Sequence, residues 1–387
     1  MSLISDQQST VLFEGEELSL PIFLDHQSTT PLAPDVKEVM DDAFAVPGNA
    51  QSKSHAFGLD AAERIETAKE QVAKLIGADA DEIYFTSGAT QANQIILEAA
   101  ANNCDNPRHF ICLKTEHASL LSAQKELVRV GHQVTFLPVQ ENGRLDLADL
   151  EAAIRPETCL ISIQTANNEI GTLQDISSIG ALCKDHDIPF HSDGVQAAAT
   201  EHLNVKSLHL DAMSLSAHKI YGPQGIGALY VRRGLFSESL PKPLGTPATA
   251  LIAGFGKASD LAHTNREKDK AHLFTLSGIL KETLIRELGE DVFFNGDQTK
   301  RIPGCLNVSF KGVSAENLLF ECPSLALSTG SACLSAEGET SHILKAIRLD
   351  ASAADCTLRI GLGRYVTEKE TRYAASILVS AYKRLRS

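Results

Sequence analysis

The chain has 387 residues, of which 43% are hydrophobic and 22% are charged, an ordinary composition for a globular protein large enough for two domains. Its formal net charge is −14, so its overall electrostatic field opposes binding to nucleic acid or to an anionic membrane. No apolar run approaches the ~20 residues of a membrane-spanning helix, and the acidic N-terminal stretch lacks the basic and apolar regions of a signal peptide. These features predict a cytoplasmic protein with no nucleic-acid or membrane partner.

In chain order, the first strong pattern is LDAAERIETAKEQVAKLIGA, from residue 59, which places apolar side chains on one face of a helix that ends near Gly77. Short apolar runs then alternate with helix-like segments, and this alternation favours a mostly parallel sheet with helices on both faces. A further run, 226–233, follows a turn and is expected to pair antiparallel. The other predicted strands are 82–85, 109–114, 133–139, 159–164, 188–193 and 212–216.

Beyond about residue 262 the pattern changes to a long helix-like stretch at 266–288, followed by short runs that are typical of a smaller α+β unit. Thr367 and Glu370 have capping-box spacing at the start of the last predicted helix. We therefore expect an N-terminal segment (1–20), a large domain (21–262) and a small C-terminal domain (263–387).

Polar side chains follow four of the predicted strands, at the point where each strand ends: His117, Asn168, Asp193 and Lys219. In an open parallel sheet the ligand crevice lies beyond the carboxyl ends of the strands, so we expect these side chains to meet there. TSGAT (86–90) likewise follows a strand and opens a helix, where backbone N–H groups suit a phosphate or a carboxylate. Taken singly, each residue has a structural alternative, such as a helix N-cap for Asp193.

The eight cysteines form no CxxC pair, so the sequence contains no motif for zinc or iron–sulfur ligation, and we expect no metal site. In a reducing compartment most of them are expected to be buried thiols. Cys333 differs from the others because it lies in LSTGSACLSAEGE, a run of small residues that gives a side chain little steric cover.

Eight motifs occur in order along the chain: GNAQSKSHAFG, FTSGAT, EHAS, ANNEIG, HSDGVQ, SAHKIYGPQGIGALYVRRG, STGSAC and LRIGLGRYVT. Together they resemble the cysteine desulfurases, pyridoxal-phosphate (PLP) enzymes of the class V aminotransferase group, from LDHQSTTPL (24–32) to IGLGRYVTEKE (360–370). The resemblance implies the α/β architecture of PLP fold type I. In that fold a large domain has a mostly parallel seven-stranded sheet between helices, and a smaller α+β C-terminal domain follows it.

The resemblance implies that Lys219 holds PLP as a Schiff base, the role that this cofactor requires of a lysine. Asp193 is implied to face the pyridine nitrogen and keep it protonated, with Gln196 donating to the ring oxygen. His117 is implied to stack on the ring and to shuttle protons. The phosphate is implied to be held by Ala89, Thr90, Ser216 and His218.

The substrate is implied to be L-cysteine, which is converted to L-alanine. Asn168 and Arg359 are implied to bind its carboxylate, since a guanidinium can bond both oxygens, and the motif favours Arg359 over Arg364. Cys333 is implied to attack the substrate sulfur, become a persulfide and pass the sulfur to an acceptor protein. A free thiol titrates near ~8.5, so a proton acceptor such as His117 or the substrate itself must assist.

The chain departs from the family pattern between the lysine turn and the next helix. Family members have a Gly-rich segment with an arginine there, whereas this chain has the shorter stretch LFSESLPKPLGTPATALIAGFG. Thr246 is retained, and in the family this threonine reaches the phosphate of the neighbouring subunit, which implies a homodimer with shared active sites. The chain also lacks the C-terminal tail with which housekeeping bacterial members dock an iron–sulfur scaffold protein. A specialised sulfur acceptor is therefore as reasonable an expectation as general cluster assembly.

Two other interpretations are open from the sequence. A selenocysteine lyase, or another class V aminotransferase-like activity in which Cys333 is idle, keeps the cofactor and changes the reaction. A catalytically weak, partner-dependent scaffold protein is suggested by the shortened segment at 235–246. Bound PLP and turnover of L-cysteine distinguish these interpretations.

Overall fold

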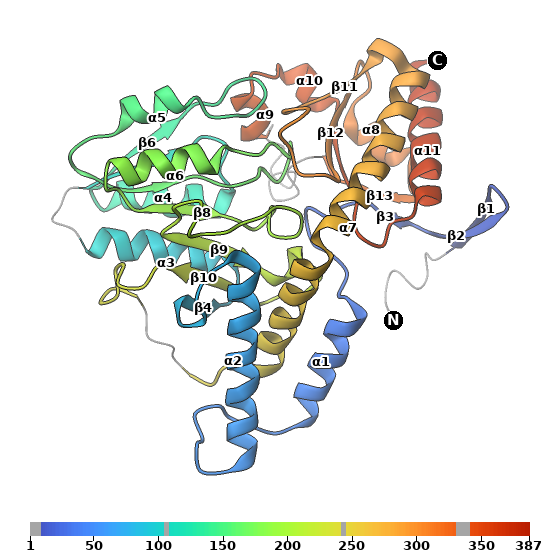
Figure 1. Ribbon diagram of the computed structural model, residues 1–387. Helices are drawn as coiled ribbons and strands as arrows, with labels where there is room; N and C mark the ends of the chain where they lie inside the picture. The colour runs from blue at the N-terminus through green and yellow to red at the C-terminus, as the bar shows by residue number, and fades with distance from the viewer. Residues whose placement is uncertain (1–8, 104–107, 241–244, 330–340) are drawn as a thin grey trace.

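A seven-stranded sheet is the largest sheet of the computed structural model, which describes residues 9–103, 108–240, 245–329 and 341–387 (Figure 1). The strand order is β4-β10-β9-β8-β7-β5-β6, and neighbours are parallel except at β10, which is antiparallel to β4 and β9. The predicted strands are thus confirmed to within a few residues, including the antiparallel pairing of the run at 226–233. The strands are β4 (Ile83–Thr86), β5 (His109–Leu113), β6 (Gln133–Leu137), β7 (Thr158–Ser162), β8 (Phe190–Asp193), β9 (Ala212–Ser216) and β10 (Gly227–Val231).

Helices cover both faces of this sheet because its strands carry apolar side chains on both sides. On β5, Phe110 and Cys112 pack in one core with α3 and α4, whereas Ile111 and Leu113 belong to the opposite core with α2, α5, α6 and α7. Successive side chains of a strand point to opposite faces, so a sheet buried on both sides requires continuous apolar runs. The helices are α2 (Ala56–Ile76), α3 (Ala89–Asn102), α4 (Ala118–Arg129), α5 (Leu147–Ala153), α6 (Ile176–Asp185) and α7 (Thr249–Leu288).

The long helix α7 begins at Thr249, well before residue 266, where the sequence pattern placed its start. Its first turns read TALIAGFGKAS, which resembles a loop because of the two glycines. These glycines allow close packing of helices: a Cβ on Gly256 would lie 2.6 Å from the Cα of Ala68 on α2, and one on Gly254 would lie 2.7 Å from the Met40 side chain on α1 (Pro34–Ala45). The prediction missed this half of the helix because a linear pattern does not show how near its neighbours lie.

Two predicted helix ends are confirmed by their hydrogen bonds. Helix α2 ends at Gly77, which has a left-handed φ of 69° and donates its N–H to Ala73 O. Thr367 and Glu370 form the reciprocal bonds of a capping box at the start of α11 (Glu368–Arg386). Within the described ranges, no helix has both the length and the apolar character needed to cross a membrane.

A second apolar core surrounds a three-stranded sheet of order β11-β12-β14, packed against the C-terminal half of α7, α8 and α11. Leu18, Ile22 and Leu24 from the N-terminal part of the chain belong to the same core. There β3 (Ile22–Phe23) pairs in parallel with β13 (Leu325–Ala326). The domain boundaries at residues 20/21 and 262/263 stay predictions, and the second of them falls inside α7. The remaining elements are β1 (Ser9–Phe13), β2 (Glu16–Leu20), β11 (Val292–Phe294), β12 (Cys305–Phe310), β14 (Thr357–Gly361), α8 (Ala315–Phe320), α9 (His342–Ala346), α10 (Ala351–Asp355), η1 (Ala80–Glu82), η2 (Ala217–Lys219) and η3 (Gly289–Asp291).

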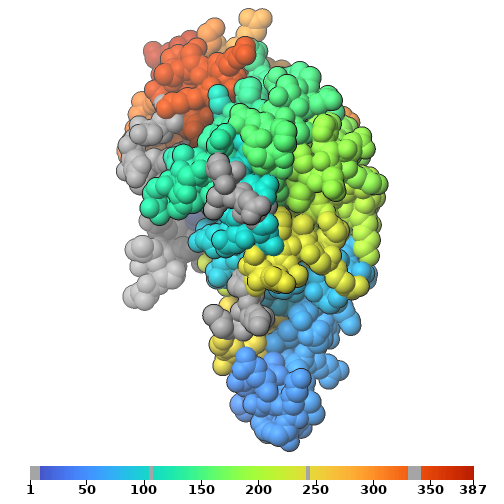
Figure 2. All heavy atoms as spheres, turned by 90° about the vertical axis from the view of Figure 1, so that its left-hand side faces the viewer, coloured from blue at the N-terminus to red at the C-terminus, as the bar shows by residue number. Residues whose placement is uncertain are grey.

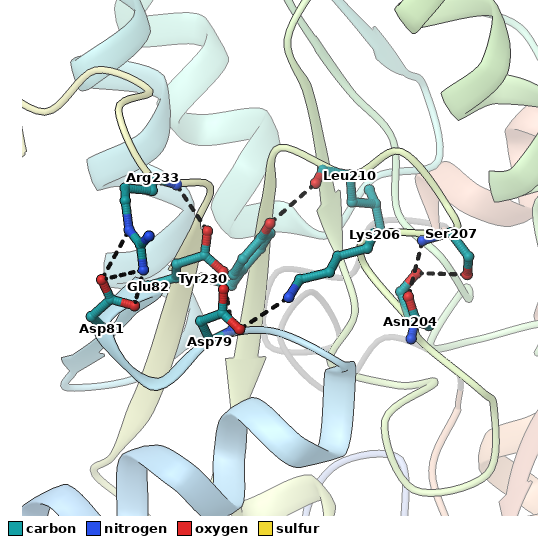
Figure 3. A network of polar contacts seen from close by, with 9 residues as sticks. All are labelled: Asp79, Asp81, Glu82, Asn204, Lys206, Ser207, Leu210, Tyr230 and Arg233. Atoms are coloured by element: carbon teal, nitrogen blue, oxygen red, sulfur yellow. Dashed lines mark hydrogen bonds and ion pairs between the residues drawn. The ribbon is translucent and has the colours of Figure 1, made fainter.

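A polar network holds together the edge of the large sheet at which β4 begins and β10 ends (Figure 3). Arg233 pairs with Asp81 at 2.7 Å, and its backbone N–H donates to Glu82 Oε1 at 2.9 Å. Lys206 bonds Asp79 at 3.0 Å. Solvent screens exposed ion pairs of this kind, so they contribute little to the stability of the fold.

His191 on β8 is a fully buried histidine that connects three neighbouring strands. Its Nδ1 lies 2.8 Å from Ser162 Oγ on β7, and its Nε2 lies 3.0 Å from Ser214 Oγ on β9. Burial lowers the pKa of His191 from 6.5 to about 3. The unfolded chain therefore binds a proton here at a higher pH than the folded chain, so the stabilisation is complete above pH 6.5 and is lost as the pH falls toward 3.

We expect His191 alone to lower the free energy of unfolding by up to ~1.4 kcal/mol per pH unit within this window. Urea unfolding at neutral pH and near pH 4 measures that slope, which should be smaller in His191→Gln than in the wild type. His186→Gln, at an exposed position, is the matched control and should keep the wild-type slope. Equal slopes in His191→Gln and the wild type would show that His191 does not bind the proton that destabilises the fold.

Candidate active site

A cavity of about 590 Å³ lies beyond the carboxyl ends of the parallel strands and is closed on one side by residues of β14 and α9. Thr246 does not line it, and Cys333 lies outside the described residues. The structure brings the other predicted site residues together in its wall: Ala89, Thr90, His117, Asn168, Asp193, Gln196, Ser216, His218, Lys219 and Arg359.

Lys219 projects from the short 3₁₀ turn η2 that follows β9, and its amine contacts the N-terminal loop. Nζ donates to the backbone oxygens of Gln27 and Ser28, the second at 2.6 Å. The turn beyond the lysine requires a glycine, since a Cβ on Gly222 would lie 2.9 Å from the Cβ of Ala217. Gly222 therefore allows the chain beyond the lysine to pack against Ala217, to which its N–H also donates at 2.9 Å.

Asp193 ends β8, and two donors orient its carboxylate. Asn93 on α3 donates from Nδ2 to Oδ2 at 3.0 Å, and the N–H of Val195 donates to Oδ1 at 3.1 Å. Gln196 lies one turn further and donates from Nε2 to Gln27 O at 3.0 Å. Asp193 thus accepts a backbone N–H as a helix cap does, and it also lines the cavity. A capping role and a role in the site are therefore compatible.

His117 is the N-cap of α4 and lines the cavity. Its Nδ1 accepts the N–H of Ser119 at 3.2 Å and lies 2.8 Å from Ser119 Oγ. Because a backbone N–H can only donate, neutral His117 carries its proton on Nε2. Burial lowers the pKa of His117, and the Asp193 carboxylate offsets that shift only in part. At neutral pH the residue is therefore an uncharged donor through Nε2.

Arg359 on β14 is only 3% exposed, and its guanidinium is held by three groups. It donates to Asn168 O at 3.1 Å, to Ser28 Oγ at 2.7 Å and to the Asp25 carboxylate at 2.8 Å. Within the part of the chain that the structure describes, its Nε has no hydrogen-bond partner. Arg359 also lines the cavity, where its planar guanidinium suits a carboxylate.

Arg364, the neighbouring arginine, has a different environment. It pairs with Asp269 at 2.6 Å, lies 4.3 Å from the centre of the Tyr221 ring, and does not line the cavity. Its backbone N–H also bonds the Tyr221 hydroxyl at 2.6 Å. Arg364 therefore connects the segment after β14 to the loop after Lys219, which agrees with the preference for Arg359 as the ligand-facing arginine.

The amino end of α3 forms the anion-binding side of the cavity. Its N-cap is Gly88, so no side chain caps the first backbone N–H groups of the helix, those of Ala89 and Thr90. Such groups, together with the helix dipole, bind phosphate. Burial and then the charge of Lys219 lower the pKa of His218 to about 4, so His218 offers the cavity a hydrogen bond rather than a positive charge at neutral pH.

These donors and acceptors fit PLP. The uncapped helix end suits its phosphate, the amine of Lys219 suits its aldehyde, and the oriented carboxylate of Asp193 suits its protonated pyridine nitrogen. The three groups line one cavity of a size that admits a ligand of this class.

Several cavity-lining residues had no predicted role. Gln27 to Thr29 and Glu169 lie within the stretches LDHQSTTPL and ANNEIG, so a sequence signal existed for them, although it did not say which side chains face the cavity. No motif marked His342, and Asn93 behind Asp193 lies in an ordinary helix pattern. The lining residues without a predicted role include Gln27, Ser28, Thr29, Ser119, Gln164, Glu169, Gln224 and His342.

Comparison with known proteins agrees with this geometry. The chain matches the family model described as aminotransferase class-V over residues 22–244 and 239–373. It is 40% identical over 390 residues to the cysteine desulfurase IscS of Rickettsia prowazekii (strain Madrid E), a match that covers 96% of this chain and 93% of that protein. It is 42% identical over 378 residues to a cysteine desulfurase of Homo sapiens, covering 95% of this chain and 82% of that protein.

Among solved structures, a NifS-like protein is similar with a TM-score of 0.84 and 28% sequence identity, over 95% of this chain and 100% of that one. This likeness confirms the predicted fold class. The chain therefore belongs to the aminotransferase class-V family and, within it, to the cysteine desulfurases.

Proposed function

We propose that this protein is a PLP-dependent enzyme that converts L-cysteine to L-alanine and passes the sulfur, through a persulfide on Cys333, to an acceptor protein. The observation that carries the proposal is the convergence of Lys219, Asp193, His117 and Arg359 in one cavity. PLP, when bound, supplies an electron sink for the electrons released at the substrate Cα. The relatives that are named cysteine desulfurases support L-cysteine as the substrate.

Two sets of residues would hold the cofactor, one at its phosphate and one at its aldehyde. Ala89 and Thr90 bind the phosphate through backbone N–H groups at the uncapped end of α3, and Ser216 and His218 add side-chain hydrogen bonds. Lys219 would hold the cofactor through Nζ, in exchange for its contacts with the backbone oxygens of Gln27 and Ser28.

Asp193 would keep a proton on the cofactor's ring nitrogen, because Asn93 and the N–H of Val195 orient its carboxylate and neither donor carries a charge. Gln196 donates to the ring oxygen in exchange for its bond to Gln27. His117 holds its proton on Nε2 and delivers it from that atom.

Arg359 and Asn168 bind the carboxylate of the substrate. The guanidinium of Arg359 lines the cavity, and Asp25 and Ser28 keep it in a single orientation. We therefore expect the α-carbon of the amino acid to lie between Arg359 and the amine of Lys219.

Cys333 lies between two described residues that contact the wall of the cavity. Ser328 O accepts the backbone N–H of Arg359 at 2.7 Å, and Ser341 Oγ donates to the Glu169 carboxylate at 2.6 Å. In the sequence, Cys333 comes five positions after Ser328 and eight positions before Ser341. Both flanking contacts support a role for Cys333 at this cavity.

A homodimer with shared active sites is a further part of the proposal. Gly245, next to Thr246, accepts a hydrogen bond from Gln51 at 3.0 Å, and none of the three lines this chain's own cavity. Gln51 belongs to the connection between α1 and α2, which projects from the body of the molecule (Figures 1 and 2). Phe44 and Phe57 beside it are 67% and 54% exposed. Exposed aromatic side chains favour a protein partner, which supports a second copy whose cofactor phosphate Thr246 reaches.

The test of the proposed function is to give purified, PLP-loaded protein L-cysteine and a reductant and to measure alanine and sulfide together. We expect equal amounts of both products, and loss of both in Cys333→Ala because no thiol is left to accept the sulfur. Cys356→Ala, at a half-buried cysteine outside the cavity, is the matched control and should keep the wild-type rate. Full turnover in Cys333→Ala would show that Cys333 is idle, and a preference for L-selenocysteine would identify a selenocysteine lyase.

A further inference from the structure

Ser119 on α4 lines the cavity and has no part in the function proposed above. Its hydroxyl oxygen lies 2.8 Å from Nδ1 of His117, and its backbone N–H donates to the same nitrogen at 3.2 Å. A backbone N–H can only donate, so Nδ1 carries no proton, and the hydroxyl at 2.8 Å is then a second donor to it. Nδ1 of His117 therefore accepts two hydrogen bonds from one residue.

Asn93 on α3 determines the direction in which the Ser119 hydroxyl points. The amide of Asn93 contacts the Asp193 carboxylate at 3.0 Å, and an ionised carboxylate can only accept, so the group that faces it is the NH₂. The same Nδ2 lies 3.4 Å from Ser119 Oγ, a longer contact. Ser119 Oγ thus accepts from Asn93 and donates to His117. A donor behind a hydroxyl polarises it and strengthens the hydrogen bond that the hydroxyl makes.

This network connects two side chains that the proposed function places at the cofactor, His117 and Asp193. Asn93 is fully buried, Asp193 is buried and Ser119 is half-buried, so the network lies in the wall of the cavity and not on the outer surface. Hydrogen bonds are electrostatically stronger in such surroundings than in water. The two hydrogens of one amide therefore act on both sides of the site.

The charged groups that face His117 act in opposite directions on its protonation. Burial lowers the pKa of His117, the Asp193 carboxylate raises it, and the charges of Lys219 and His342 lower it. Glu116 precedes His117 and is fully buried; burial raises the pKa of Glu116 well above its ordinary value, so this carboxyl is neutral. Asp193 is therefore the group that favours a positive charge on His117.

A positive charge on His117 would compete with the proposed role of Asp193. An imidazolium would attract the carboxylate that the proposed function assigns to the cofactor's ring nitrogen. Protonation at Nδ1 also requires His117 to give up both hydrogen bonds from Ser119, because a protonated nitrogen cannot accept them. The hydroxyl of Ser119 therefore opposes the effect of Asp193 on His117.

We propose that Ser119 is a positioning residue that holds His117 neutral, with its ring proton on Nε2, and so leaves the negative charge of Asp193 to the cofactor's ring nitrogen. Asn93 assists by directing the Ser119 hydroxyl toward His117. The inference rests on the proposed function, which brings the cofactor to both His117 and Asp193.

Four variants separate the hydroxyl from the fold around it. Ser119→Ala removes the hydroxyl but keeps the backbone N–H that His117 accepts as the N-cap of α4. Ser119→Thr keeps the hydroxyl and is the conservative variant. Asn93→Ala removes the donor behind the hydroxyl. Ser122→Ala makes the same change as Ser119→Ala at an exposed serine of the same helix and is the matched control.

The first measurement is a pH titration of the histidine ring nitrogens by nitrogen-15 NMR in full-length, PLP-loaded protein, with the His117 signal identified by its loss in His117→Gln. We expect the wild type at neutral pH to show one neutral form of His117, protonated on Nε2 alone. In Ser119→Ala the neutral form loses a donor, so the pKa of His117 rises and the doubly protonated form appears at higher pH. Asn93→Ala should shift the titration in the same direction by less, and Ser119→Thr and Ser122→Ala should match the wild type.

The second measurement is the pH dependence of kcat/KM for alanine formation from L-cysteine. In Ser119→Ala we expect kcat/KM to fall ~3- to 10-fold on the acidic side of the profile, the ratio that corresponds to one hydrogen bond. At higher pH it should return to the wild-type value, because His117 is neutral there without the hydroxyl. Ser119→Thr should keep the wild-type profile.

Three results would overturn the proposal: an unchanged His117 titration in Ser119→Ala, an equal change in Ser119→Thr, or a loss of kcat/KM in Ser119→Ala that is the same at every pH. The last result would identify a structural role. If Asn93→Ala does not fold, the two Ser119 variants decide the question. If the wild type forms no alanine from L-cysteine, the proposed function fails, and the His117 titration still decides whether Ser119 controls the protonation of this histidine.

Discussion

Lys219→Ala is expected to lower the turnover of L-cysteine by at least ~10³-fold while leaving the fold intact. Lys219 supplies the cavity's only amine among the described lining residues, so nothing replaces it in attaching PLP or in moving the substrate proton. The carbonyls of Gln27 and Ser28 would lose a donor, but they border the cavity, where water can replace it. Alanine formation measures the loss, and the visible absorbance of the protein after dialysis reports whether PLP stays attached.

Lys206→Ala is the matched control for that experiment. Lys206 is an exposed lysine that pairs with Asp79 at the opposite edge of the sheet (Figure 3), so its removal should change neither absorbance nor turnover. Turnover within tenfold of the wild type in Lys219→Ala would refute the assignment of this lysine.

Asp193→Asn is expected to lower kcat for alanine formation by ~10² to 10³-fold without releasing PLP. The amide has nearly the same shape as the carboxylate, and its oxygen can still accept the N–H of Val195. It carries no negative charge, however, so a proton on the cofactor's ring nitrogen is no longer stabilised and the ring withdraws electrons less well. Steady-state kinetics and absorbance on the same preparation separate slower chemistry from lost cofactor.

Two comparisons sharpen this test. Asn93→Ala should have a smaller effect, because the N–H of Val195 still orients the carboxylate. Asp185→Asn, at an exposed aspartate at the end of α6, should match the wild type. Wild-type kcat in Asp193→Asn would show that the ring nitrogen does not depend on this carboxylate.

The location of the site followed from the order of residues along the chain. Parallel strands end at one edge of a sheet, so side chains that follow successive strands converge there whatever the details of packing. His117, Asn168, Asp193 and Lys219 meet in the cavity for this reason. The helix end at Gly77 and the capping box at Thr367 were likewise predictable, because both depend only on neighbouring residues.

The elements that the pattern missed depend on distant neighbours. The first half of α7 has a loop-like sequence because its glycines lie against α1 and α2, which only the folded chain brings near. Arg359 and Arg364 lie close together in sequence but have different surroundings. Arg359 is part of β14 and borders the cavity, whereas Arg364 follows β14 and pairs with Asp269.

The sequence by itself therefore determined the fold class, the family and the set of residues that gather at the sheet edge, since these follow from periodicity, motif order and strand direction. Only the tertiary structure decided which atoms of those residues form hydrogen bonds, and with which partners. Asn93 orients Asp193 from 100 positions away, and the backbone oxygen of Gln27 accepts a hydrogen bond from the amine of Lys219. Hydrogen-bond partners of this kind are chosen by packing between segments that are remote in the chain, and no local pattern encodes them.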